Sequence, residues 1–213
     1  MSELQTPTAA TPAGELAVDF EPMNRGAFLL KGVLAAGALY GAASVTPLVQ
    51  RVFAQGGGGD VDILNFAYTL ELLEADFYKQ AQKSVKLSSD VKKFAEEAGQ
   101  NEQDHVDALN GAIKKLGGKP AATPTFTFPL KDEKSFMDLA VTFEDTGVSA
   151  YNGAGPMIES KDLLATAGSI VQIEGRHAGA IRYLAGLQPV VGAFDATLDM
   201  DKVLSAVKPF IKA

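Results

Sequence analysis

Residues 101–109, with the sequence NEQDHVDAL, contain the motif Glu102-Gln103-Asp104-His105. The same Glu-x-x-His spacing returns in residues 173–178, IEGRHA, at Glu174 and His177. The two motifs contain both histidines of the 213-residue chain, and two such matches are unexpected by chance among only 12 glutamates. Residues three positions apart lie on one face of an α-helix, so each motif places a carboxylate beside an imidazole. The sequence therefore predicts two helices that each carry half of a polar site.

Two more glutamates stand at corresponding places ahead of these motifs. Glu71 precedes Glu102, and Glu144 precedes Glu174, at intervals that differ by a single position. Each of the two is followed two helical turns later by a tyrosine, Tyr78 or Tyr151. The halves of the chain therefore repeat, with Glu71 equivalent to Glu144 and Glu102 equivalent to Glu174. Such an internal repeat predicts a pseudo-twofold arrangement in which the equivalent residues of both halves meet.

Apolar residues at helical spacing surround all four positions and predict four long helices and a short final one. Capping residues and glycines set the expected ends. The four long helices are expected from Asp62 to about Lys83, from Ser88, Ser89 or Asp90 to Leu116, from Asp132 or Ser135 to Gly153, and from Ser160 or Asp162 to Gly186 or Leu187. A helix from about Asp201 to Ile211 is expected to close one end of the molecule.

The segment between the second and third helices determines the topology. Three prolines and the alternating run Thr125-Phe126-Thr127-Phe128 exclude a helix between Gly117 and Lys131 and favour an extended chain. Fifteen extended residues reach ~50 Å at ~3.3 Å each, whereas the preceding helix is ~42 Å long at ~1.5 Å per residue. We therefore expect an all-α fold, a four-helix bundle of two antiparallel hairpins joined by one long crossover connection, with a short C-terminal helix.

Four glutamates and two histidines should converge in the core of this bundle. Four carboxylates carry a charge of −4, which two divalent ions balance, and burying such charge without a partner would be costly. The predicted metal ligands are Glu71, Glu102, His105, Glu144, Glu174 and His177. Cysteine is absent, and a carboxylate-rich site suits iron or manganese. The His-Glu-x-x-His order of zinc proteases is also missing.

Several neighbouring residues leave alternatives open. Glu74, one turn after Glu71, is expected to be an outer or surface acid, although it could replace Glu71 as a ligand. Tyr78 and Tyr151 are either plain core aromatics or hydrogen-bond donors to ligand carboxylates. Three acids are expected to be solvated: Asp104, Asp107 and Asp145. Three glycines of the fourth long helix indicate a close approach of another helix there: Gly168, Gly175 and Gly179.

The chain up to Ala54 reads as a separate unit. Residues 1–22 have the composition of a disordered leader, and residues 24–54 match an export signal that is cleaved after Ala54. Arg25 resembles the start of a twin-arginine signal, but Gly26 stands where the second arginine belongs, which argues against that route. The alternative is an uncleaved anchor, since residues 32–49 are uncharged. A glycine-rich linker, residues 55–60, would then lead into a bundle over residues 61–213.

Four stretches resemble a known family: NFAYTLELLEADFY at residues 65–78, EQDHVDAL at 102–109, GGKP at 117–120 and EGRHA at 174–178. They are similar to the exported ferritin-like-domain proteins of the desiccation-related type, from about Val61 to Ile211. The wider ferritin-like superfamily implies terminal ligands at Glu71 and Glu144, bridging carboxylates at Glu102 and Glu174, and one histidine per metal. It also implies Fe(II) with dioxygen or peroxide in oxidases, and manganese in catalases.

Three functions fit these features. The first is an exported redox enzyme of stress protection in which two iron or manganese ions react with dioxygen or peroxide. The second is a metal-binding or storage protein, and the third is a non-enzymatic, desiccation-protective bundle. A net charge of −7 argues against nucleic acid as a partner. Contact with a membrane is expected only through an uncleaved N-terminal signal, and assembly into a homo-oligomer is left open.

Overall fold

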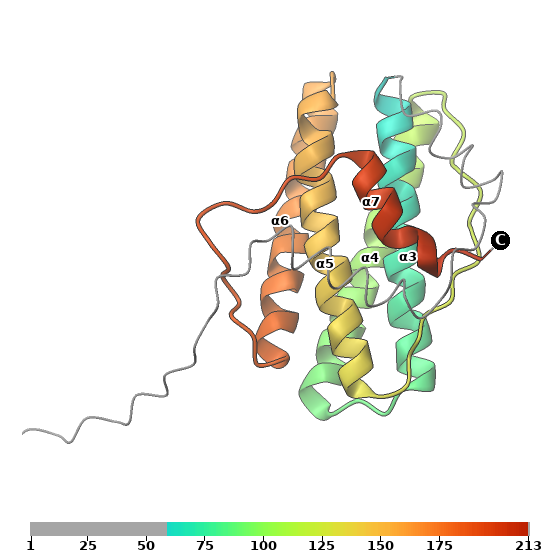
Figure 1. Cartoon of the computed structure of the whole chain (residues 1–213). Coiled ribbons are helices and arrows are strands. Elements are labelled where there is room, and N and C mark those ends of the chain that lie inside the picture. Colours follow the sequence, from blue (N-terminus) through green and yellow to red (C-terminus); the bar gives the residue numbers. More distant parts are fainter. Residues whose placement is uncertain (1–58, 213) are drawn as a thin grey trace, which may run out of the picture.

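The computed structural model describes residues 59–212, which form a bundle of four long helices with a short helix on its side (Figure 1). In chain order the helices are α3 (Asp60–Ser84), α4 (Ser89–Lys115), α5 (Glu133–Ala154), α6 (Lys161–Leu184) and α7 (Met200–Val207). Two short 3₁₀ helices follow α5 and α7, at Gly155–Met157 and Lys208–Phe210. The expected all-α fold is confirmed, and the final helix is shorter than expected because its last turn, which contains Pro209, is a 3₁₀ turn.

Local chemistry fixes the helix ends that the sequence left open. At the start of α5, Asp132 accepts a hydrogen bond from the Ser135 backbone while the Ser135 side chain binds the Asp132 backbone, so the two candidates form one capping box. Ser160 caps α6. Gly117 ends α4 with a φ of 76°, a conformation that glycine adopts without strain.

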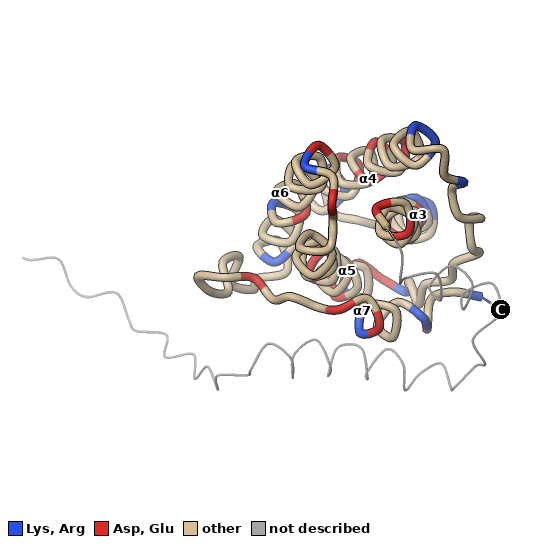
Figure 2. The backbone as a smooth tube through the Cα atoms, turned by 90° about the horizontal axis from the view of Figure 1, so that it is seen from above, with Lys and Arg blue, Asp and Glu red and all other residues tan. Residues whose placement is uncertain are grey.

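The four long helices form two hairpins, α3 with α4 and α5 with α6. Seen end-on in Figure 2, they surround a common interior, and α7 lies outside next to α5. The segment between α4 and α5 runs along the bundle as expected and is extended, with Phe126 in an isolated antiparallel bridge to Ile211 near the C-terminus. One long crossover therefore joins the two hairpins.

The apolar core lies in two clusters with a polar layer between them. Along α4, Val91 and Ala98 belong to the first cluster, whereas Leu109 and Ile113 belong to the second. Glu102 and His105 occupy the positions between these two sets and are themselves buried. The fold thus encloses a charged layer on both sides with hydrocarbon.

The glycines of α6 do not mark a close helix contact, contrary to expectation. A Cβ added at Gly168 or Gly175 would meet nothing within 4 Å, and one at Gly179 would meet only a carbonyl oxygen at 3.8 Å. The tight positions lie elsewhere in the bundle. At Gly99 a Cβ would come within 2.9 Å of Tyr78 Cβ, and at Gly147 within 2.7 Å of Glu174 Oε2.

The N-terminal predictions fall largely outside the described residues. The leader, the export signal, the cleavage site and residues 55–58 of the linker belong to that part of the chain. Asp60, the last residue of the predicted linker, is already helical in α3. Among residues 59–212, no helix has the length and apolar character needed to cross a membrane.

Candidate metal centre

All six predicted ligands lie in the buried layer at the middle of the bundle. Glu71 comes from α3, Glu144 from α5, and one Glu-x-x-His pair each from α4 and α6. The four carboxylates are at most 2% exposed, and the histidines 9% and 6%. Four separate helices are therefore needed to build the site, and each contributes side chains from its inner face.

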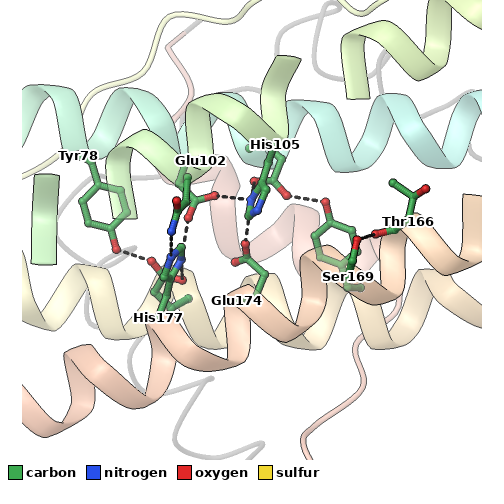
Figure 3. Close-up of polar contacts among 11 residues, drawn as sticks. Tyr78, Glu102, His105, Thr166, Ser169, Glu174 and His177 are labelled. Atoms are coloured by element: carbon green, nitrogen blue, oxygen red, sulfur yellow. Dashed lines mark hydrogen bonds and ion pairs between the residues drawn. The ribbon is translucent and has the colours of Figure 1, made fainter. Parts of the chain in front are cut away.

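The first group of ligand atoms surrounds His105. Its Nδ1 lies 3.2 Å from Glu71 Oε2, 3.2 Å from Glu102 Oε2 and 3.3 Å from Glu174 Oε1 (Figure 3). One ligand atom from each of these four residues lies within 4.8 Å of the others. Three carboxylates and one imidazole from α3, α4 and α6 thus face a common point.

The second group surrounds His177 in the corresponding way. Its Nδ1 lies 2.9 Å from Glu102 Oε1 and 3.4 Å from Glu144 Oε2, and Glu174 completes the group within the same 4.8 Å. Glu102 and Glu174 belong to both groups, whereas Glu71 and Glu144 belong to one each. The two matching groups are what the internal repeat predicts, and the sharing of Glu102 and Glu174 is what the resemblance to the ferritin-like superfamily implies.

The chemistry of these atoms fits metal ions. Several buried atoms of the site make no hydrogen bond within the described part of the chain: Glu102 Oε1, Glu144 Oε2, both oxygens of Glu174, and His177 Nδ1. All except Glu174 Oε2 lie only within ion-pair distance of a histidine or carboxylate of the site. A buried polar atom without a partner costs about 1–3 kcal/mol, more if it is charged. Cations placed between these atoms would remove that cost, and carboxylate oxygens with imidazole nitrogens are ligands that iron and manganese accept. The six residues could therefore hold metal ions.

Comparison with known protein families agrees with this geometry. The profile of the ferritin-like domain matches residues 59–187, which include all six predicted ligands and the four long helices. The chain belongs to the ferritin-like domain family. No curated protein matches this chain.

Two tyrosines of this ferritin-like domain connect its halves. Tyr78 on α3 donates its hydroxyl hydrogen to Glu144 Oε1 on α5, and Tyr151 on α5 donates to Glu71 Oε1 on α3 at 2.5 Å. Burial, together with the nearby carboxylates, raises the pKa of both phenols well above the usual value, so they remain hydrogen-bond donors. Of the two alternatives for these tyrosines, the hydrogen bond to a candidate ligand is the observed one.

Burial and the contacts among the site residues shift the pKa values of several of them in opposite directions. Burial, followed by repulsion from the neighbouring carboxylates, raises the pKa of Glu102 and Glu174 well above the usual value. Burial alone would lower the pKa of His105, but its close contacts with Glu174 and Glu71 and the attraction of both acids raise it to about 10. Burial opposes ionisation of Glu71 as well, yet its contacts with His105 and Glu102 hold its pKa below the usual value. The environment therefore favours the charged forms of Glu71 and His105 and the protonated forms of Glu102 and Glu174.

Asn101 contacts the site although no feature of the sequence pointed to it. Its side-chain nitrogen Nδ2 lies 3.0 Å from His177 Nε2. For His177 to offer the lone pair of Nδ1 to a cation, Nε2 must carry the hydrogen, so the Asn101 amide would have to turn over and present its oxygen to Nε2. The equivalent position of the second half is Ile173, which has no polar side chain. The internal repeat therefore gave no reason to expect a site residue at Asn101.

Asp145 is not solvated, contrary to expectation. Arg182 on α6 binds it through Nε at 3.0 Å and through a second, shorter contact from Nη2, and the side chains of Arg182 and Asp145 are only 10% and 15% exposed. Asp104 and Asp107 are exposed, as expected. The Asp145–Arg182 pair fastens α5 to α6 just outside the candidate site.

An apolar cavity of about 30 Å³ lies between α3, α4, α5 and α6 at one end of the charged layer. Its lining includes Leu70, Leu109 and Ala150, and it extends to Tyr151, the residue that binds Glu71. A cavity of this size exceeds the ~10–15 Å³ that one water molecule occupies by the same measure, and apolar cavities of this kind tend to stay dry. The domain thus has apolar space that can hold a small uncharged molecule next to the site.

Proposed function

We propose that this ferritin-like domain is an exported dimetal oxidoreductase that binds two iron or manganese ions and reduces dioxygen or peroxide in protection against stress. The proposal includes the narrower relationship to the desiccation-related type that the sequence motifs indicate. It treats Glu71 and Glu144 as ligands of one ion each, and Glu102 and Glu174 as ligands shared by both ions. His105 and His177 each complete one position.

One observation carries this proposal. Four carboxylates and two imidazoles meet in a buried layer, and five of their ligand atoms lack a hydrogen-bond partner among the described residues. A cluster of six ionisable groups would be expensive to bury if its purpose were only to stabilise the fold. Two divalent ions would neutralise the four carboxylates, so the loaded site would fit an interior of low polarity.

The bound metal would supply reversible one-electron oxidation and sites for a small oxidant. The residues of the chain perform the remaining tasks. Glu102 and Glu174 hold the two positions at a short separation, because each belongs to both groups of ligand atoms. Tyr78 and Tyr151 fix the orientation of the two outer carboxylates by hydrogen bonds from the opposite hairpin.

The apolar cavity beside Tyr151 favours dioxygen as the small molecule that reaches the site. Dioxygen loses few interactions with water when it enters an apolar space, whereas peroxide leaves several hydrogen bonds behind. The cavity therefore supports the oxidase form of the proposal over the peroxidase form.

Export is proposed from the sequence alone. Val52 and Ala54 satisfy the small-residue rule for cleavage after Ala54, so the mature chain should begin at Gln55 outside the cytoplasm. Sequencing of the N-terminus of protein purified from its natural host tests this. An intact leader in the membrane fraction would favour the anchor instead.

Elemental analysis of the purified mature protein, followed by assays of Fe(II) oxidation and peroxide consumption, tests the proposed function. We expect about two iron or manganese ions per chain and turnover that depends on dioxygen. Two bound ions without turnover would indicate a binding or storage protein. The absence of stoichiometric metal, even after reconstitution with Fe(II) or Mn(II), would contradict the proposal and favour a purely protective bundle.

A further inference from the structure

The internal repeat breaks at one acidic position inside the site. Glu71 is equivalent to Glu144, so Glu74, one turn further along α3, is equivalent to Gly147 on α5. The first half of the chain therefore carries a fifth acid where the second half has no side chain. At this point the two halves of the site differ by a whole carboxylate.

Gly147 provides the space for this acid. A Cβ built at Gly147 would lie 2.7 Å from Glu174 Oε2 and 3.4 Å from Glu74 Oε1. Both carboxylates thus border the point where a side chain at position 147 would begin. There is room for one long acidic side chain between α3 and α5, and it belongs to Glu74.

Glu74 is also buried without a hydrogen-bond partner for one of its oxygens. It is 5% exposed, and its Oε2 makes no hydrogen bond with any residue that the structure describes. The surface location considered for Glu74 is therefore wrong. Glu74 does not replace Glu71 either, because Glu71 already binds His105 and Tyr151 and belongs to the first group of ligand atoms.

We propose that Glu74 is a seventh ligand, a fifth carboxylate that binds one of the two metal ions and makes the two positions unequal. This inference rests on the proposed function, since it concerns the same pair of ions. The carboxylates of Glu74 and Glu174 both approach the point where a Cβ at Gly147 would stand. Glu74 itself lies outside the two groups of ligand atoms, whereas Glu174 belongs to both. A cation at the Glu174 carboxylate is the partner that would satisfy the unpaired oxygen of Glu74.

The charge of the site changes accordingly. Five carboxylates carry −5, one more than two divalent ions can balance. A pair with one divalent and one trivalent ion balances it. When ionised and bound, Glu74 would therefore favour the trivalent state of the ion that it contacts, with the electron passing to the dioxygen or peroxide of the proposed function.

Titration of the metal-free protein with Co(II), followed by calorimetry and by the visible spectrum of the bound ion, tests the inference. We expect wild type to bind two ions in unequal steps. Glu74→Gln keeps the shape of the side chain and removes the anionic ligand, so it should weaken one step by at least about tenfold and change the spectrum of that ion only. Glu97→Gln, which removes one charge from an exposed position of α4, is the matched control and should leave both steps unchanged.

The stability of the metal-free variants separates a ligand from a structural acid. Since Glu74 lacks a partner at Oε2, the near-isosteric Glu74→Gln should unfold no more easily than wild type without metal, whereas Glu74→Ala would also leave a cavity. Unchanged Co(II) steps and spectra in Glu74→Gln, with two ions bound to wild type, would overturn the seventh ligand and leave the proposed function intact. Loss of stability in metal-free Glu74→Gln would overturn it as well. No stoichiometric Co(II), Fe(II) or Mn(II) on wild type would refute both proposals.

Discussion

Removing metal from the site should make the stability of the bundle fall as the pH rises from 5 to 8. Burial, followed by repulsion between neighbouring carboxylates, raises the pKa of Glu74, Glu102 and Glu174 well above the ordinary 4.5. In this range the folded chain holds protons that the unfolded chain has released. Stability decreases with pH wherever the folded state binds more protons than the unfolded state.

The size of the effect follows from the number of retained protons. Each retained proton lowers the unfolding free energy by about 1.4 kcal/mol per pH unit. The three acids together can therefore lower it by at most about 4 kcal/mol per pH unit. His105, with its pKa raised from 6.5 to about 10, adds a decrease of the same sign above pH 6.5. Glu71 acts in the opposite direction, but only below 4.5, because its pKa is lowered. The metal-free protein should therefore be most stable near pH 5.

Urea unfolding at pH 5, 6, 7 and 8, with a chelator and with Mn(II), measures both sides of this balance. Metal displaces the protons, so the stabilisation by Mn(II) should increase with pH, and each position contributes about 2.7 kcal/mol at a hundredfold excess over its dissociation constant. Glu102→Gln should reduce the metal-free slope by about one proton. A metal-free stability that stays constant or rises between pH 5 and 8 would refute the assignment of protons to these acids.

Four other substitutions test separate parts of the site and its surroundings. Glu102→Ala should abolish stoichiometric binding at both positions because its carboxylate belongs to both groups, whereas Glu71→Ala should weaken one; elemental analysis at graded metal concentrations separates these outcomes. Tyr78→Phe should weaken metal binding about tenfold by releasing the outer carboxylate of the second half, and an unchanged affinity in calorimetry would leave Tyr78 a core aromatic. Arg182→Ala should cost about 3 kcal/mol in urea unfolding because it leaves Asp145 buried and unpaired, while equal metal content confirms that this pair lies outside the site.

The helices and the members of the two groups could be predicted because both depend on spacing within the chain. Apolar periodicity locates a helix without reference to its neighbours, and the matching intervals at Glu71 and Glu144 identify equivalent positions before any packing is known. The crossover followed from prolines and from length. Such local patterns can be recognised in the sequence because the local preferences of a natural protein agree with its final fold.

The remaining features depend on which side chains meet across helices. Asn101 reaches His177 on α6 from α4, and Arg182 reaches Asp145 on α5 from α6. No spacing within one helix encodes such a pair, so the sequence pattern predicted a solvated Asp145 where the structure has a half-buried, ion-paired one. The prediction of a close helix contact at the α6 glycines was wrong for a related reason. A glycine permits the close approach of another helix but does not show that one is present.

The hydrogen bonds of Tyr78 and Tyr151 run between the two hairpins, so neither half of the repeat can build its part of the proposed site alone. Each hairpin carries an outer glutamate, but the hydrogen bond that orients this glutamate comes from the other hairpin, from Tyr78 to Glu144 and from Tyr151 to Glu71. Glu102 and Glu174, one from each hairpin, both belong to both groups of ligand atoms. An isolated hairpin would therefore expose two acids and a histidine without forming either position. Packing of α3–α4 against α5–α6 completes the core and the site in one step, so binding of metal should stabilise the contact between the hairpins most strongly.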